Sequence, residues 1–118
     1  MLKLHAIESP NLEPPALPSN PENCRIAIQL LVGPPDEPGS ESFQFLVVTP
    51  LWLADQQEVR WGTGLLIVPR FSWEVVEHSI AKLLAGTPSK SWNEAAISLS
   101  RSMAWEFENY QPYSEDGR

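Results

Sequence analysis

The prolines limit this chain more than any other feature, because they divide it into short segments of regular structure. The chain has twelve prolines, and five of them lie in residues 9–21. Proline fixes its own φ and offers no N–H to a helix or to a strand ladder. We therefore expect residues 9–21 to form an extended connection on the surface. Residues 33–41 combine three prolines with glycine, serine and aspartate, and we expect a second, turn-rich connection there.

Four segments between these breaks have the composition of β-strands. Residues 2–8, 24–32 and 42–49 alternate apolar with other side chains, and residues 61–68 end in an apolar run. Residues 33–41 would join the second and third strands as a hairpin. Pro50 ends the third strand and begins a short helical turn over residues 51–55.

Two helices are predicted after the strands. Ser72 is a suitable N-cap for the first, residues 72–84, and Gly86 and Pro88 terminate it. Ser91 and Glu94 form a capping box that begins the second, residues 91–110. A helical period places an apolar stripe on the core face of that second helix: Trp92, Ala96, Leu99, Met103, Phe107 and Tyr110. The order of elements predicts an α+β domain, with a four-stranded, largely antiparallel sheet followed by two helices packed on one face.

The tryptophans divide into two groups. Trp105, with Arg101, falls on the face of the second helix that is opposite its core stripe. We expect Trp105 either to be covered by the proline-rich residues 9–21 or to bind a partner, because aromatic anchors ringed by charge are common at interfaces. The other four lie in or beside apolar runs and are expected to pack in the core: Trp52, Trp61, Trp73 and Trp92.

Length and composition predict one cytoplasmic domain. A chain of 118 residues is expected to fold as a single domain over residues 1–118. Its one cysteine, Cys24, excludes an intrachain disulfide and fits a reducing compartment. No apolar run approaches the roughly 18 residues of a membrane span, and the first residues lack the pattern of a secretory signal. Residues 111–118 are expected to be a flexible acidic tail.

The net charge of −7 is unevenly distributed. Residues 1–58 carry eight acidic and two basic side chains, residues 59–105 carry three and five, and residues 106–118 carry four and one. Such an acidic protein repels nucleic acid and anionic membrane and attracts basic partners. We expect a basic protein partner, with no nucleic acid and no membrane.

The sequence offers little catalytic chemistry. Its candidate nucleophile and bases are Cys24, His5 and His78, which are distant in sequence, and a Cys24–His78 pair would need a contact that the sequence does not establish. No cluster has the spacing of a metal site, and Gly62-Thr63-Gly64 lacks the lysine and the length of a phosphate loop. We predict no catalytic residue, no cofactor and no metal.

Several motifs resemble those of the immunity protein 8 family, which accompanies polymorphic toxins in bacteria. The resemblance covers nearly the whole chain. Its pieces are Glu8-Ser9-Pro10, Gly33-Pro34, Ser42-Phe43-Gln44-Phe45, Thr49-Pro50-Leu51-Trp52-Leu53, Leu66-Ile67-Val68, Ser91-Trp92-Asn93-Glu94-Ala95-Ala96, Leu99-Ser100-Arg101 and Trp105-Glu106-Phe107-Glu108-Asn109-Tyr110. The resemblance implies a non-enzymatic inhibitor that binds a cognate toxin domain and protects the producing cell.

The charge and the resemblance together predict how such an inhibitor would act. We expect stoichiometric binding to a basic toxin domain, a nuclease, whose phosphate-binding surface is blocked by negative charge. The residues expected at the contact are Glu37, Glu41, Asp55, Glu58, Arg101, Trp105, Glu106 and Glu108. The chain would be a monomer or a weak homodimer. Two alternatives stay open, a self-associating structural or scaffold protein and a small enzyme.

Overall fold

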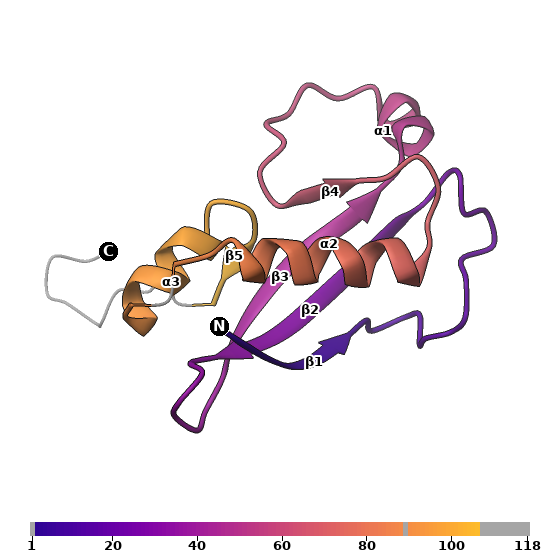
Figure 1. Ribbon diagram of the computed structural model, residues 1–118. Helices are drawn as coiled ribbons and strands as arrows, with labels where there is room; N and C mark the ends of the chain where they lie inside the picture. Colours follow the sequence, from indigo (N-terminus) through magenta and orange to yellow (C-terminus); the bar gives the residue numbers. More distant parts are fainter. Residues whose placement is uncertain (1, 89, 107–118) are drawn as a thin grey trace, which may run out of the picture.

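The computed structural model describes residues 2–88 and 90–106 and has an α+β fold (Figure 1). In chain order the elements are β1 (Lys3–Glu8), β2 (Arg25–Gly33), β3 (Glu41–Val48), α1 (Pro50–Gln56), β4 (Leu65–Ile67), α2 (Trp73–Ala85), α3 (Trp92–Leu99) and β5 (Ala104–Trp105). The predicted fold class is confirmed, because the sheet is mostly antiparallel and its helices follow the main strands. No helix in the described ranges has the length and hydropathy needed to cross a bilayer.

The sheet is mixed, which the sequence did not predict. Strands β1, β2 and β3 pair antiparallel in that order. The chain then passes through α1 and residues 57–64 and returns in the same direction, so β4 pairs parallel with the second half of β3. The first half of the same β3 edge pairs antiparallel with β5, opposite Phe43 and Gln44. The strand predicted at residues 61–68 is therefore only three residues long, and Trp61 lies outside it.

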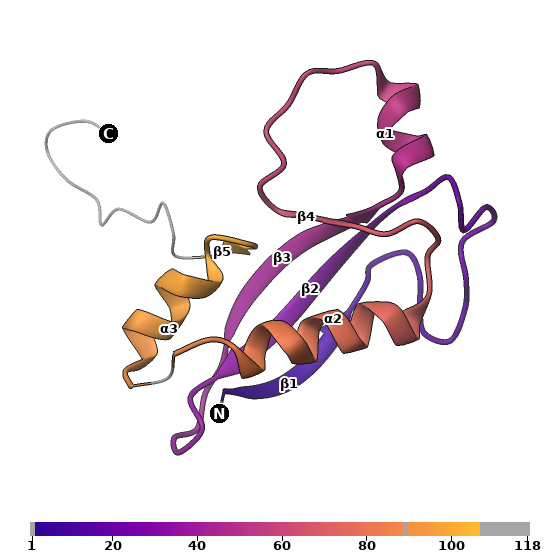
Figure 2. The ribbon, with the colours of Figure 1, turned by 45° about the horizontal axis from the view of Figure 1, so that its top comes forward.

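The core lies between one face of the sheet and the two longer helices (Figures 1 and 2). Because β2 and β3 pair in register, their alternate buried side chains meet on that face: Ile28, Leu30, Val32, Phe43, Phe45 and Val47. Helix α2 contributes Val76, Ile80 and Leu84, and α3 contributes Ala95, Ala96 and Leu99. The opposite face carries exposed side chains such as Arg25, Gln44 and Ile67.

The second long helix ends eleven residues earlier than its predicted end at Tyr110. Helix α3 begins at the expected cap, since the Ser91 hydroxyl accepts a hydrogen bond from the Glu94 N–H at 3.1 Å. It ends at Leu99, and the Ser100 hydroxyl donates to the Ile97 carbonyl at 2.6 Å. Serine competes in this way for helical backbone groups, which weakens a helix at a serine-rich segment such as 98–102.

The residues after α3 still bury part of the predicted stripe. Met103 packs in the core from the turn that leads into β5. Phe107 and Tyr110, which we expected to complete the stripe, lie outside the described residues, as do Glu108 and the predicted tail 111–118. The helical period therefore placed Met103 in the core correctly but gave Trp105 the wrong face.

The proline-rich segment holds the beginning of α2. Residues 9–24 form turns without helix or strand. The Trp73 indole N–H donates to the Ala16 carbonyl at 2.7 Å, and the Phe71 N–H donates to the Pro21 carbonyl at 2.7 Å. At its beginning, Pro10 lines a hollow together with Ala104 of β5. The expectation that residues 9–21 cover Trp105 stays a prediction, and the described ring contact of Trp105 is with Phe43 of β3.

Candidate functional site

The residues predicted to bind a partner fall into two groups, one at each end of β3. Glu37 lies in the β2–β3 hairpin and Glu41 begins β3, where Trp105 and Glu106 also lie. Asp55 lies near the end of α1, which follows the other end of β3, and Glu58 lies in residues 57–64. Arg101 is exposed in the turn after α3. The structure thus brings Glu41, Trp105 and Glu106 together and separates them from Asp55 and Glu58.

Trp105 belongs to the sheet and is not a free aromatic anchor. Its ring stacks on the ring of Phe43, with centroids 6.2 Å apart and planes 11° apart. Its indole N–H donates to a carboxylate oxygen of Glu41 at 2.8 Å. The next residue, Glu106, accepts a hydrogen bond from the Ser42 N–H through its carboxylate and donates its own N–H to the Ser42 carbonyl. These contacts hold β5 against β3, so Trp105 and Glu41 have a structural role.

We expect Trp105→Ala to lower the free energy of unfolding by about 2 kcal/mol, because a half-buried indole loses roughly half of what a fully buried one contributes. Trp105→Phe keeps an aromatic ring but loses the bond to Glu41, and it should cost about 1 kcal/mol. Urea denaturation followed by circular dichroism measures both. Unchanged stability in both variants would contradict the structural role and return Trp105 to the partner-binding group.

The hairpin end carries the exposed acidic side chains of Asp36 and Glu37. They line a hollow of about 350 Å³ between the hairpin and the beginning of α3, to which Lys90 and Trp92 also contribute. Neither carboxylate has a hydrogen bond or an ion pair in the described part of the chain. They are therefore available to a basic partner.

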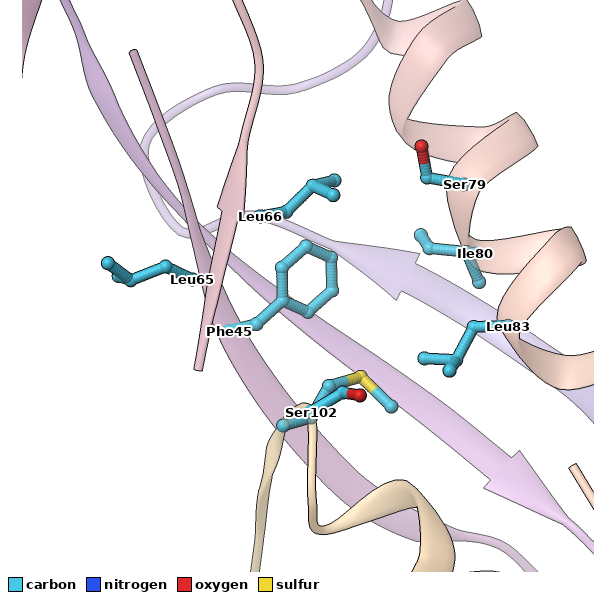
Figure 3. A pocket seen from close by; sticks show the side chains of 8 residues that line it. Phe45, Leu65, Leu66, Ser79, Ile80, Leu83 and Ser102 are labelled. Carbon is cyan, nitrogen blue, oxygen red and sulfur yellow. The ribbon is translucent and has the colours of Figure 1, made fainter. Parts of the chain in front are cut away.

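An apolar pocket of about 210 Å³ lies between the sheet and α2 (Figure 3). Phe45 and Leu66 point into it from β3 and β4, Ile80 and Leu83 face them from α2, and Leu65 points away. Ser79 and Ser102 supply its hydroxyl groups. The pocket is an extension of the core that has room for about one apolar side chain, and it contains no charged group.

The candidate nucleophile does not face a histidine. Cys24 is buried at the start of β2, where its thiol donates to the Pro21 carbonyl at 3.6 Å. Burial raises the pKa of the Cys24 thiol above its ordinary value, which disfavours the reactive thiolate. His5 on β1 and His78 on α2 are both exposed. Among the described residues, no three His, Cys, Asp or Glu side chains lie close enough together to hold a metal ion.

The sequence interpretation missed the most exposed large apolar side chains among the described residues. Trp61 was expected in the core with Trp73 and Trp92, yet its side chain is 93% exposed, and the nearby Val59 is fully exposed. Trp73 is buried and Trp92 packs against the core, as predicted. The available signal was the position of Trp61 between Arg60 and Gly62, four positions before the apolar run begins at Leu65.

Comparison with known proteins identifies the class. Residues 2–110 match the family Immunity protein 8, and the chain belongs to that family. It is thus an immunity protein, and its match covers every element of the fold described above. No curated protein and no solved structure was found to match the chain.

Proposed function

We propose that this protein binds a bacterial toxin domain one-to-one in the cytoplasm of the producing cell and inhibits it by occupying its substrate surface. The observation that carries the proposal is the match to Immunity protein 8 over residues 2–110. The inhibitor acts by binding alone and makes or breaks no covalent bond. Its inhibition therefore depends on the contact surface and on the rate of association.

The charge of the chain supports a basic toxin, of which a nuclease is the main example. A nuclease carries positive charge where phosphates dock, and a chain of net charge −7 is attracted to that surface. Exposed acids occur at both ends of β3, as Asp36 and Glu37 in the hairpin and as Asp55 and Glu58 after it. Together they extend the attraction over the length of the sheet.

We expect the association rate to fall at least about tenfold between about 50 and about 500 mM salt, because exposed charges are screened over roughly 10 Å at 0.1 M. Stopped-flow mixing with the toxin domain encoded by the neighbouring upstream gene measures this rate. The dissociation rate should change much less, because it reports the short-range contacts.

The double variant Asp36→Asn/Glu37→Gln removes two exposed negative charges from the hairpin end of β3. It should slow association at low salt and have little effect at high salt. An association rate that stays constant across the salt range would exclude electrostatic attraction while leaving inhibition by binding in place. Failure of the wild-type protein to bind the toxin domain would exclude the proposed function itself.

A further inference from the structure

Residues 57–64 form a loop between α1 and β4 that stands clear of the sheet and the helices in both views (Figures 1 and 2). This loop carries the two most exposed large apolar side chains of the described residues, Val59 and Trp61. An exposed tryptophan contributes little to folding, whereas at protein interfaces tryptophan is the residue type most enriched among the strongest contributors to binding. The loop therefore presents apolar surface that the fold itself does not use.

Both ends of the loop are held by the fold. Gln57 ends α1 in the left-handed region, with φ 54°, and its N–H donates to the Ala54 carbonyl. Gly64, with φ 81°, accepts a hydrogen bond from the Leu46 N–H of β3 at 2.9 Å. A loop with fixed ends loses less conformational freedom on binding than a free segment. Val59 and Trp61 therefore lie in a loop whose two ends are held in place.

The loop alternates charged and apolar side chains in its sequence. Arg60 and Glu58 form an ion pair at 3.8 Å although they are two residues apart. Val59 lies between them and Trp61 follows, and both side chains are exposed to solvent. The charged groups of the loop therefore pair with each other, while its apolar side chains stay uncovered.

The backbone of the same segment has open hydrogen-bonding groups. In residues 2–88 and 90–106, the N–H and C=O groups of residues 58–61 make no backbone hydrogen bond. A segment with open backbone groups can pair with a strand edge of another protein once it becomes extended, and its alternate side chains then enter pockets. Backbone pairing and an aromatic anchor are therefore available on one short segment.

The occupant is a basic protein and not a second copy of this chain. Two copies would bring a net charge of −7 against −7, which opposes association. A basic partner is attracted by the same net charge, and the exposed Asp55 contributes to it near the end of α1, just before the loop.

We propose that residues 58–61 are the docking element of this immunity protein, and that the Trp61 indole is buried in an apolar recess on the toxin. This inference rests on the proposed function and adds the part of the surface that holds the partner. Acidic side chains at both ends of β3 attract the toxin at long range, and the loop makes the short-range contacts that keep it bound.

The test compares Trp61→Ala with Ile97→Ala, which truncates an exposed apolar side chain on α3. Binding of the toxin domain encoded by the neighbouring gene is measured by calorimetry. Trp61→Ala should weaken binding by at least about 30-fold, while Ile97→Ala should stay within about threefold of the wild type. Both variants should keep the wild-type melting temperature, because neither side chain is buried.

Three results would overturn the inference. Equal binding by Trp61→Ala and the wild type would remove the loop from the contact and leave the proposed function intact. No binding by the wild type would exclude the proposed function and, with it, the occupant named here. A concentration-dependent dimer in sedimentation experiments that Trp61→Ala abolishes would make a second copy the occupant and would support the scaffold alternative.

Discussion

Phe43→Ala should lower the free energy of unfolding by about 3–5 kcal/mol. The Phe43 side chain is fully buried on the inner sheet face, near the hairpin end of β3. Its ring meets Trp92 of α3 edge-on, with centroids 6.2 Å apart, and stacks on Trp105 of β5. Removing the ring therefore loosens three elements at once, which is why we expect a value at the upper end for a core truncation. Urea denaturation followed by tryptophan fluorescence measures the loss.

Phe43→Leu is the matched control, because it keeps an apolar side chain of similar volume and should cost about 1.5 kcal/mol or less. A domain of this size is stable by about 5–15 kcal/mol, so the alanine variant should lose about a fifth of its stability or more. A cost below about 1 kcal/mol for Phe43→Ala would contradict the packing of α3 and β5 around this ring.

The sequence predicted the elements whose signals are local. The first three strands lie within about one residue of their predicted ends, because alternation and proline breaks are properties of neighbouring residues. Helix α2 begins after the predicted cap, with the Ser72 hydroxyl accepting from the Val75 N–H. Each of these features is decided by residues a few positions apart.

The sequence did not predict the features that depend on distant partners. A helical period continues through Met103, so the apolar pattern does not distinguish a helix ending at Tyr110 from one ending at Leu99, and the serines of residues 98–102 only weaken the helix there. The difference is made by pairing between Trp105 and Phe43, which are 62 positions apart in the chain. The parallel direction of β4 likewise depends on the path of residues 57–64 and not on the composition of Leu65–Ile67.

The candidate site was only partly predictable for a related reason. The charge of each side chain can be read from the sequence, so the acidic character of the proposed contact residues could be predicted. Their division between the two ends of β3 could not. Glu41 is engaged by Trp105 and Glu106 by Ser42, and both contacts join distant segments. Trp61 was placed in the core because hydrophobicity generally predicts burial, whereas its side chain is exposed on the loop of residues 57–64.

Thr49→Ala should cost about 2–4 kcal/mol, although it removes only one hydroxyl and one methyl group. Thr49 is fully buried and is the one buried polar residue among those described. Its hydroxyl oxygen accepts hydrogen bonds from the Trp52 N–H, as the N-cap of α1, and from the Cys24 N–H at the start of β2. Losing the cap costs about 1 kcal/mol, and leaving the buried Cys24 N–H without a partner costs about 1–3 kcal/mol more.

Two further variants at position 49 distinguish the contribution of the hydroxyl hydrogen bonds to stability from the contribution of side-chain packing. Thr49→Ser keeps the acceptor and should cost about 1 kcal/mol, the value of one buried methyl group. Thr49→Val keeps the shape but loses both hydrogen bonds, so it should be nearly as unstable as Thr49→Ala. If Thr49→Val were as stable as the wild type, packing and not hydrogen bonding would explain the position.

Hydrogen exchange can show which backbone amides lose protection in these variants. The Trp52 and Cys24 amides should exchange faster in Thr49→Ala and Thr49→Val than in Thr49→Ser, because only the first two variants remove their acceptor. Helix α1 has no buried residue of its own, so its position depends on this cap and on the bond between Asn23 and Asp55. The loop that carries Trp61 begins directly after α1. A variant that frees α1 should therefore also weaken toxin binding, and one that leaves α1 in place should not.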